Sequence, residues 1–458
     1  MKPINENYAR IPALFTDLYE ITMAAAYWDN KLNSIATFDL FFRELHPKRN
    51  FFVTAGIEQA LNYILNLKFD NDEIEYLRNL EIFQNINPDF FDYLSNLHFS
   101  GTVRAISEGT FIFSNEPVLE ITAPIIEAQI LETALLSIVN FETMVASKAV
   151  RVVRAAQGRI VVEFGARRAH GPGAAVSGAR AACLAGCAGT SNLEAGMLYN
   201  LPVYGTIAHS FIMAHDDELT AFKEFAKTFP QHVILLIDTY DTLEGARLAA
   251  RLGNIVKGVR LDSGDLLYLS NEVRKILDDA DLKETKIMAS GDLNESRIQE
   301  LMNAGAPIDM FGVGSELITS KDAPTMTGVY KLVETEESGK RHARIKLSTD
   351  KKTLPGRKQV YRNRGFDGLY KMDIISEEGE YDSDKSLEPL LHTYILNGQL
   401  IEELPKLPQI RSHLDNQLKS FPESLMQLKK RVKYPTKLSE RLKDVRRDAT
   451  KEHEEWKN

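Results

Sequence analysis

Residues able to bind or transfer charged groups recur in the middle of the chain, each time directly after a short apolar run. Arginine, histidine, aspartate and glycine follow six such runs, at residues 160–164, 202–207, 233–237, 255–261, 286–289 and 308–313. Arginine presents a planar fork that matches carboxylates and phosphates, and glycine turns let backbone N–H groups approach an anion. The recurrence therefore predicts a site for an anionic, phosphorylated metabolite.

Two of these junctions carry most of the anion-binding signal. Arg167 and Arg168 follow the first run, and Gly312 and Gly314 precede Ser315 at the end of the last run. Each has a plainer explanation, because arginine pairs occur on surfaces and glycine pairs occur in tight turns. The third glycine of a dinucleotide-binding fingerprint is missing. The pattern favours a phosphate site and does not indicate a Rossmann fold.

A histidine and two carboxylates follow the second and fourth runs. His209 could act as a general base, a ligand or a nucleophile, or it could be a structural histidine. Arg260 is followed by Asp262 and Asp265 around a glycine turn. These carboxylates could bind Mg²⁺, ribose hydroxyl groups or Arg260 itself, or they could cap a helix.

The alternation of the six runs with amphipathic segments predicts a parallel sheet with crossover helices. The expected helices lie at residues 217–229, 242–252, 270–280 and 295–304. The carboxyl ends of such strands meet on one face of a barrel, or at a crevice of an open sheet. Either arrangement would bring the polar junctions together.

The two ends of the chain show a different, mixed pattern. The expected helices are 17–27, 127–150 and an exposed, charged one at 438–450 that starts after Pro435 and Thr436; the expected strands are 36–42, two strands with a turn within 102–114, 343–347 and 359–361. The changes in pattern divide the chain into residues 1–150, 151–330 and 331–458.

Composition narrows the class of protein further. The 458 residues are 44% hydrophobic and carry a net charge of −9, which argues against a general nucleic-acid-binding surface. Two cysteines, Cys183 and Cys187, exclude a disulfide scaffold and a four-cysteine zinc site. We expect no signal peptide in the first twelve residues and no apolar run long enough to span a membrane. These observations predict a soluble cytoplasmic enzyme or regulator.

Nine phrases of the sequence, in order along the chain, resemble the nicotinate phosphoribosyltransferase family. They are TDLYEITM at 16–23, EFGARRAHG at 163–171, GTSN at 189–192, GTIAHS at 205–210, DTYDT at 238–242, RLDSGD at 260–265, GVGS at 312–315, KLS at 346–348 and LPGRKQVYR at 354–362.

The resemblance implies a fold and a reaction. The implied fold is an irregular α/β barrel of the type II phosphoribosyltransferase kind, at 151–330, with a second, smaller α+β domain built from 1–150 and 331–458. The implied enzyme converts nicotinate and phosphoribosyl pyrophosphate to nicotinate mononucleotide and pyrophosphate, the first step of NAD salvage from nicotinate. ATP hydrolysis is coupled to this transfer through a phosphohistidine at His209, and Mg²⁺ is the expected metal.

The resemblance also implies roles for particular residues. His209, Arg260 and Asp262 are the expected catalytic residues, and Ser315 stands where the family pattern has threonine. The resemblance does not identify the Mg²⁺ ligands; by their chemistry alone, Asp262, Asp265 and Asp292 are the candidates. The family is commonly dimeric, and Tyr19 is expected to reach the neighbouring subunit's site. The expected substrate-binding residues are Tyr19, Phe164, Arg168, Thr206, Ser210, Ser290, Asp292, Gly312, Gly314 and Ser315.

Two other interpretations remain beside this one. A nicotinamide phosphoribosyltransferase would prefer a neutral amide to the nicotinate anion. A barrel that binds a nucleotide without turnover would be a sensor and not an enzyme. In every case the expected partners are small molecules and a second copy of the chain, without nucleic acid or a membrane.

Overall fold

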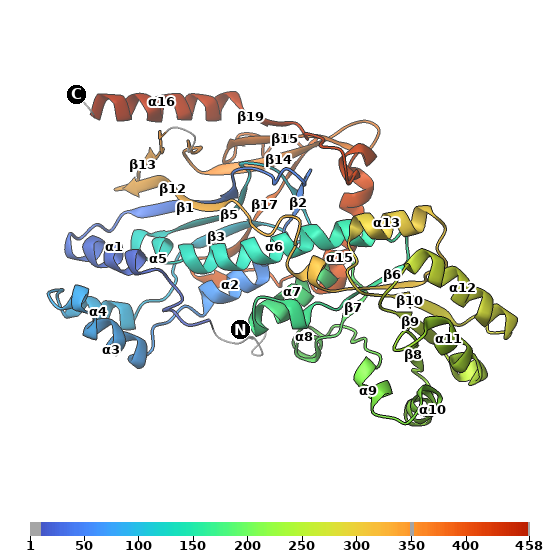
Figure 1. The fold of residues 1–458 in the computed structure, drawn as a ribbon. Coiled ribbons are helices and arrows are strands. Elements are labelled where there is room, and N and C mark those ends of the chain that lie inside the picture. Colours follow the sequence, from blue (N-terminus) through green and yellow to red (C-terminus); the bar gives the residue numbers. More distant parts are fainter. Residues whose placement is uncertain (1–10, 349–351, 457–458) are drawn as a thin grey trace. The chain divides into compact units, whose positions relative to one another are not determined.

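The computed structural model describes residues 11–348 and 352–456, and its contacts divide the chain into two units (Figure 1). One unit consists of Met1–Met144 together with Thr325–Asn458, and the other of Val145–Pro324. Most of the segment in which we expect no signal peptide lies outside the described residues. The unit built from both chain ends is the larger of the two, so the expectation of a smaller domain there was wrong. This unit is the larger one because the described parts of the two chain ends together form three β-sheets, whereas the other unit contains one.

The unit Val145–Pro324 contains a six-stranded parallel sheet in the order β7-β6-β11-β10-β9-β8. Its inner strands are almost wholly buried, as the apolar runs predict. The strands are β6 (Ile160–Glu163), β7 (Gly189–Thr190), β8 (Ile234–Leu236), β9 (Gly258–Leu261), β10 (Lys286–Ala289) and β11 (Met310–Val313). The predicted α/β class with a parallel sheet is thus confirmed.

Polar side chains cap several helices of this unit. Asp217, Asp241, Asp265 and Asn294 accept backbone N–H groups at the starts of four predicted helices. The helices are η2 (Ala166–Arg168), α7 (Pro172–Leu184), α8 (Leu193–Tyr199), α9 (His209–Met213), α10 (Glu218–Thr228), α11 (Thr242–Ala250), η3 (Gly253–Ile255), α12 (Leu266–Asp279), α13 (Glu295–Asn303) and α14 (Ser315–Ile318).

One predicted strand of this sheet, at 202–207, was wrong. Val203 makes an isolated parallel bridge to Thr190, and no strand forms around it. Pro202 lacks an N–H donor and Gly205 favours irregular backbone, so a longer ladder is disfavoured. Consequently β7 and β8 are the edges of the sheet, and hydrogen bonds among the described residues do not close it into a ring.

The larger unit is built around an antiparallel sheet in the order β13-β12-β1-β5-β3-β17-β18. A four-stranded sheet, β16-β14-β15-β19, and the pair β2-β4 complete it. The strands are β1 (Ile35–Phe42), β2 (Phe52–Val53), β3 (Thr102–Ile106), β4 (Phe111–Ile112), β5 (Pro117–Pro124), β12 (Gly328–Glu337), β13 (Lys340–Ala343), β14 (Lys358–Arg364), β15 (Tyr370–Glu377), β16 (Leu387–Pro389), β17 (Leu391–Leu396), β18 (Gln399–Leu400) and β19 (Thr436–Leu438).

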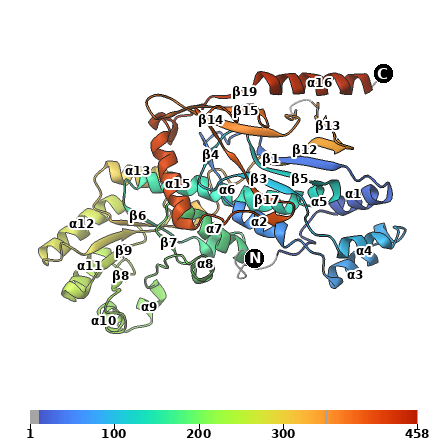
Figure 2. The ribbon, with the colours of Figure 1, turned by 180° about the vertical axis from the view of Figure 1, so that it is seen from behind.

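Helices from both chain ends accompany these sheets. Figure 2 shows α16 on the outer side of the unit, where it contacts β13 and β15. The helices are α1 (Leu18–Asp29), α2 (Ile57–Leu65), α3 (Asn71–Asn79), η1 (Glu81–Phe83), α4 (Asp89–Ser95), α5 (Ile125–Gln129), α15 (Leu407–Ser420), η4 (Glu423–Met426) and α16 (Glu440–Trp456); α6 (Glu132–Ala155) runs across the division between the units.

Several expected boundaries at the chain ends need correction. The two strands within 102–114 form, but β3 pairs with β5 and β17 while β4 pairs with β2, so they are not partners. The strand expected at 343–347 was wrong, because the strand in this region is Lys340–Ala343 and residues 344–347 are not in a strand. The last helix begins at Glu440, because Thr436–Leu438 are already paired with β15.

One helical stretch corrects the expectation that no apolar run is long enough to span a membrane. Ile125–Ala155 is long and apolar enough to cross a membrane, with a mean hydropathy of 1.3 in its most apolar window. However, 61% of that window is buried within the protein. The stretch is therefore a core helix by its surroundings.

Candidate active site

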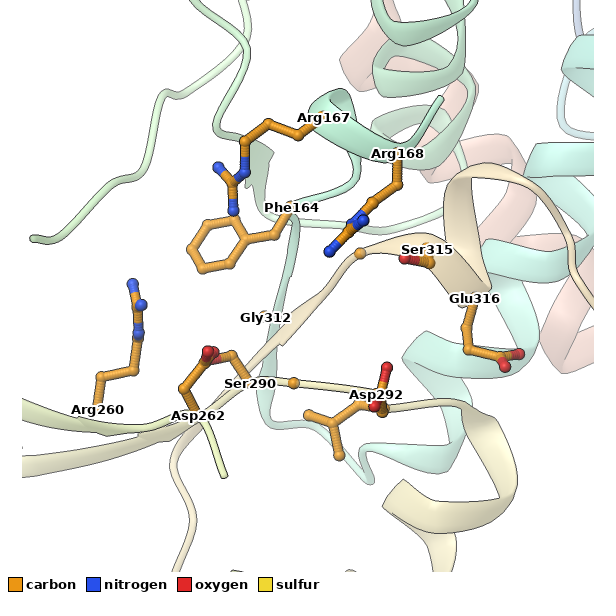
Figure 3. A pocket seen from close by; sticks show the side chains of 13 residues that line it. Phe164, Arg167, Arg168, Arg260, Asp262, Ser290, Asp292, Gly312, Ser315 and Glu316 are labelled. Carbon is orange, nitrogen blue, oxygen red and sulfur yellow. The ribbon is translucent and has the colours of Figure 1, made fainter. Parts of the chain in front are cut away.

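A polar pocket lies over the carboxyl ends of the four inner strands β6, β11, β10 and β9 (Figure 3). All its lining residues belong to the unit Val145–Pro324. They are Phe164, Arg167, Arg168, Arg260, Asp262, Ser290, Gly291, Asp292, Leu293, Gly312, Gly314, Ser315 and Glu316. Nine residues expected at the site from the sequence are among them.

Three arginines point into this pocket from two sides. Arg167 and Arg168 extend from η2, which follows β6, and Arg260 extends from β9 toward the same space (Figure 3). Burial lowers the pKa of Arg260, against the opposing effect of Asp262 and Asp238. The guanidinium still remains charged at neutral pH. The pocket is thus suited to an anionic ligand.

Arg260 has an unused donor. Its Nη1 lies 2.5 Å from the hydroxyl oxygen of Thr206, whereas its buried Nε has no hydrogen-bond partner among the described residues. A buried N–H without a partner costs free energy that a bound acceptor would recover. Two residues expected at the site, Thr206 and Arg260, are thus joined by a hydrogen bond. Thr206 itself does not line the pocket.

The ring of Phe164 lies close to the backbone of β11. A Cβ atom at Gly312 would come within 2.5 Å of the Phe164 ring and 3.0 Å of Met288 Cε. Glycine is needed here because this close approach leaves no space for a side chain. Gly312 thus allows the ring to form an aromatic wall of the pocket.

We expect Gly312→Ala to displace the Phe164 ring and weaken binding of a planar aromatic substrate. Loss of one aromatic contact should raise the KM for that substrate roughly fivefold, about 1 kcal/mol. Steady-state kinetics on Gly312→Ala and on the control Gly173→Ala, where nothing lies within 4 Å of the added Cβ, test this. An unchanged KM in Gly312→Ala would contradict the role given to the ring.

The loop after β10 has a strained backbone at the pocket. Gly291 has a φ of +80°, and a Cβ there would lie 2.1 Å from the carbonyl oxygen of Asp262. Asp292 has a φ of +36°, which is uncommon for a residue with a side chain. The Ser290 hydroxyl donates to Asp262 Oδ1. These contacts fix Ser290 and Asp292 beside the glycine turn at Gly314 and Ser315.

His209 does not line the pocket, but it lies close to Asp262, which does. It is the first residue of α9, and its Nε2 lies 3.9 Å from Asp262 Oδ2. Its Nδ1 is 3.2 Å from the hydroxyl oxygen of Thr239. Asp262 is itself held by its N–H, which donates to Asp238 Oδ2 at 2.9 Å. The imidazole is therefore oriented by Thr239 at Nδ1, while Nε2 lies on the side of Asp262, and the ring remains partly exposed to solvent.

Three expected site residues lie elsewhere. Tyr19 belongs to α1 in the other unit, and Ser210 follows His209 in α9 without lining the pocket. Asp265 caps α12 by accepting the N–H groups of Leu267 and Tyr268. Of the three candidate metal ligands, only Asp262 and Asp292 line the pocket among the described residues.

Sequence reasoning missed several residues at or behind this pocket. Leu293 and Glu316 line it, and no pattern in the sequence singled them out; Gly291 also lines it and was visible only as a residue after a predicted strand. Arg167 was visible as half of the arginine pair, and Asp238 and Thr239 as the polar residues after a predicted strand. Treating every strand-end residue as a candidate would have found the last three.

Buried carboxylates support the junctions. Glu163 accepts hydrogen bonds from the Thr190 hydroxyl, at 2.6 Å, and from the Gly165 N–H, and so holds the turn that carries the arginines. Burial raises the pKa of Glu163, and these two hydrogen bonds oppose the rise.

Burial together with Asp238, Asp241 and Glu244 raises the pKa of Glu218 to about 7.

The raised pKa of Glu218 predicts a pH-dependent stability. The folded protein binds this proton more tightly than the unfolded chain, so the stabilisation is present below about pH 4.5 and is lost as pH rises through about 7. We expect the free energy of unfolding of Glu218→Gln, measured relative to that of the unchanged protein, to be higher at pH 8 than at pH 5. Urea unfolding at both pH values tests this, and a difference that does not vary with pH would contradict it.

Comparison with known families decides what kind of protein carries this pocket. Residues 14–140 match the nicotinate phosphoribosyltransferase N-terminal domain, residues 160–366 the nicotinate phosphoribosyltransferase family, and residues 380–446 its C-terminal domain. The chain belongs to the nicotinate phosphoribosyltransferase family. The resemblance seen in the sequence is thereby confirmed, and the protein is an enzyme of this family.

Individual relatives cover nearly the whole chain. A nicotinate phosphoribosyltransferase of Mycobacterium tuberculosis is 44% identical over 94% of this chain and 92% of its own length. That of Bacillus subtilis is 39% identical over 93% of each chain. The crystal structure of human nicotinic acid phosphoribosyltransferase matches with a TM-score of 0.83 and 28% identity, covering 94% of this chain and 99% of the human one.

A second solved structure extends the likeness. Nicotinate-nucleotide pyrophosphorylase from Pyrococcus furiosus matches with a TM-score of 0.72 and 27% identity, over 89% of this chain and 95% of its own. The mixed α/β fold of this chain is therefore shared with both of these solved structures.

Proposed function

We propose that this nicotinate phosphoribosyltransferase couples ATP hydrolysis to the synthesis of nicotinate mononucleotide through a phosphohistidine at His209. The observation that carries the proposal is the arrangement of His209 between Thr239 and Asp262, at the edge of a pocket that three arginines face. The pocket supplies the binding site for the two anionic substrates, and His209 supplies the link to ATP.

Arg260 and Phe164 are suited to nicotinate. The carboxylate of nicotinate can accept from the Arg260 guanidinium, whose Nε lacks a partner, while Thr206 holds the guanidinium in place. The flat wall formed by Phe164 can stack on the pyridine ring. A carboxylate gains more than a neutral amide from the half-buried Arg260 cation, which favours nicotinate over nicotinamide.

Arg167, Arg168 and the glycine turn are suited to phosphoribosyl pyrophosphate. The two guanidinium groups can pair with phosphate oxygens, and Gly314 and Ser315 offer N–H and hydroxyl donors. The transfer breaks the bond from the sugar carbon to pyrophosphate and forms one to the pyridine nitrogen. The sugar passes through an oxocarbenium-like state, so positioning and charge stabilisation dominate.

The residues of the pocket are compatible with Mg²⁺ that arrives on a phosphate. The described residues contain no group of three or more His, Cys, Asp or Glu side chains that could hold a metal ion. Mg²⁺ commonly takes one or two carboxylates and completes its shell with water and substrate phosphates. Asp262 and Asp292 could supply those carboxylates, and the bound ion would neutralise charge on the leaving pyrophosphate.

The geometry of His209 supports a phosphoryl transfer at Nε2. Thr239 engages Nδ1, which leaves Nε2 as the nitrogen that faces Asp262 and the pocket. Nε2 attacks the γ-phosphorus of ATP, the bond from that phosphorus to the bridging oxygen breaks, and ADP leaves. Water later attacks the same phosphorus, releases phosphate and regenerates the imidazole. Phosphorylated His209 places negative charge beside the substrates between these two steps.

Labelling with ATP tests this proposal directly. Protein incubated with ATP labelled in the γ-phosphate should carry label that acid removes and alkali does not, which is typical of a phosphohistidine. The label should be absent from His209→Ala and present in His215→Ala, a control in which the lost histidine pairs with Glu224. Equal labelling of both variants would contradict the assignment of His209.

The same proposal includes a homodimer with shared sites and a cytoplasmic location. Phe15 lies three residues before α1, and Leu18 and Tyr19 are its first two residues; these large hydrophobic side chains are 44%, 52% and 44% exposed. Such a surface is suited to a second copy of the chain, into whose site Tyr19 would reach. The acidic net charge agrees with small-molecule partners, without nucleic acid or a membrane.

Mixing two weakly active variants tests the shared site. We expect Tyr19→Ala and His209→Ala to be weakly active alone and to regain activity when they are unfolded and refolded together. In a mixed dimer one site contains neither substitution, provided that Tyr19 acts in the partner's site. Absence of recovery, with dimers shown by sedimentation, would place Tyr19 outside the shared site.

A further inference from the structure

A buried network of charged side chains lies behind the glycine turn of the pocket, with Lys148 of α6 at its centre. The side chain of Lys148 is 1% exposed, and its Nζ lies 2.5 Å from Glu295 Oε2 and 2.9 Å from Asp322 Oδ1. Arg151, one turn further along α6, places its Nε 3.0 Å from Glu295 Oε1. All four residues belong to the unit that contains the pocket.

Glu316 connects this network to the pocket. It lines the pocket directly after Ser315, and its Oε2 lies 3.7 Å from Lys148 Nζ. Its other oxygen, Oε1, lies 3.1 Å from the Nζ of Lys321, a side chain that is 68% exposed. Figure 3 shows the Glu316 carboxylate turned away from the pocket's arginines. Both oxygens are thus held by lysines on the side remote from those arginines.

The electrostatic consequence follows from burial. An ionised carboxylate facing the pocket would repel the phosphates of a substrate, and a buried cation neutralises it better than an exposed one because solvent screens the latter. Burial by itself raises the pKa of Glu295, but Lys148 and Arg151 lower it below its usual value. Glu295 is therefore ionised and fixes Lys148 in place.

We propose that Lys148 is a positioning residue for the binding of phosphoribosyl pyrophosphate. Lys148 pairs with Glu316 and keeps the Glu316 carboxylate from facing the substrate's phosphates. Lys148 does not line the pocket, so it acts through Glu316 and does not touch the substrate. The inference rests on the proposed use of this pocket for phosphates, and it assigns a role that no motif in the sequence indicates.

A double-mutant cycle tests this role. The four proteins are the unchanged enzyme, Lys148→Met, Glu316→Gln and the double variant. The readouts are the KM for each substrate, kcat, and calorimetric binding of inorganic pyrophosphate. We expect Lys148→Met to raise the KM for phosphoribosyl pyrophosphate and the Kd for pyrophosphate roughly tenfold, with a smaller change in the KM for nicotinate. Glu316→Gln should change them by less than about threefold, and in the double variant it should restore most of the loss.

The control is Lys321→Met, which removes the exposed lysine from the same carboxylate and should change each constant by less than about twofold. Should methionine at position 148 prevent folding, Lys148→Gln removes the charge and keeps donors for Glu295 and Asp322. A structural role, or a direct long-range effect of the lysine charge, predicts that Glu316→Gln has the same effect in both backgrounds. Additive effects of the two substitutions would overturn the proposed role of Lys148. Failure of the unchanged enzyme to bind pyrophosphate would overturn both this role and the proposed use of the pocket for phosphates.

Discussion

His209→Ala is expected to remove the stimulation of turnover by ATP. Without the imidazole there is no nitrogen beside Asp262 to accept the γ-phosphoryl group, so ATP can be neither consumed nor used. Turnover in the presence of ATP should fall roughly 100-fold or more, toward the rate of the unchanged enzyme without ATP. Parallel assays of nicotinate mononucleotide and ADP measure the two losses in the same sample.

The control for this variant is Thr239→Val, which keeps the imidazole but removes its hydroxyl partner at Nδ1. We expect a partial loss, with ATP consumption and product formation still linked. His209→Ala protein that is stimulated by ATP as strongly as the unchanged enzyme would show that the coupling runs through another residue.

Arg260→Gln is expected to lower kcat/KM for nicotinate about 100-fold, equivalent to about 3 kcal/mol. The substitution removes a half-buried cation, its buried donor Nε and its contact with Thr206. The neutral amide of nicotinamide would lose an ordinary hydrogen bond, so its kcat/KM should fall only about fivefold. The preference between the two substrates should therefore shrink.

Arg247→Gln is the matched control, because Arg247 is an exposed arginine on α11 of the same unit and pairs with Glu244 of its own helix. It should leave both kcat/KM values within about twofold. Equal losses for nicotinate and nicotinamide in Arg260→Gln would instead indicate that Arg260 stabilises the fold or binds the other substrate.

The parallel sheet was readable from the sequence because its strands are buried on both faces and its helices are amphipathic. β10 was predicted at its observed bounds, and helices α10, α11, α12 and α13 were predicted within a few residues. The segment 202–207 was misread because its apolar residues suggested a strand, whereas Pro202 and the brevity of β7 limit pairing to one bridge at Val203.

Non-local pairing was beyond reach of the sequence. Nothing near residues 102–114 shows that β3 finds its partners in β5 and β17, or that both chain ends join one large sheet. Periodicity reports which face of a strand is buried and says little about which strand covers it. The same limit explains why the unit formed by the chain ends was expected to be the smaller one.

At the site, residues adjacent in sequence to strand ends were found and residues that act across elements were not. Arg168, Arg260 and Ser315 were marked by their types and positions, and the pocket brings them together. Lys148 lies in an apolar helix that carries no motif, and its proximity to Glu316 is visible only in the fold. Asp265 looked like a metal ligand because a helix cap uses the same residue type.

The most direct measurement of the central claim is the formation of mononucleotide by the purified protein from phosphoribosyl pyrophosphate and Mg²⁺. Nicotinate and nicotinamide are compared, each with and without ATP. We predict that nicotinate mononucleotide forms, that ATP increases its yield, and that nicotinamide is a poor substrate. Efficient turnover of nicotinamide, or no turnover of either substrate with intact pyrophosphate binding, would contradict the account.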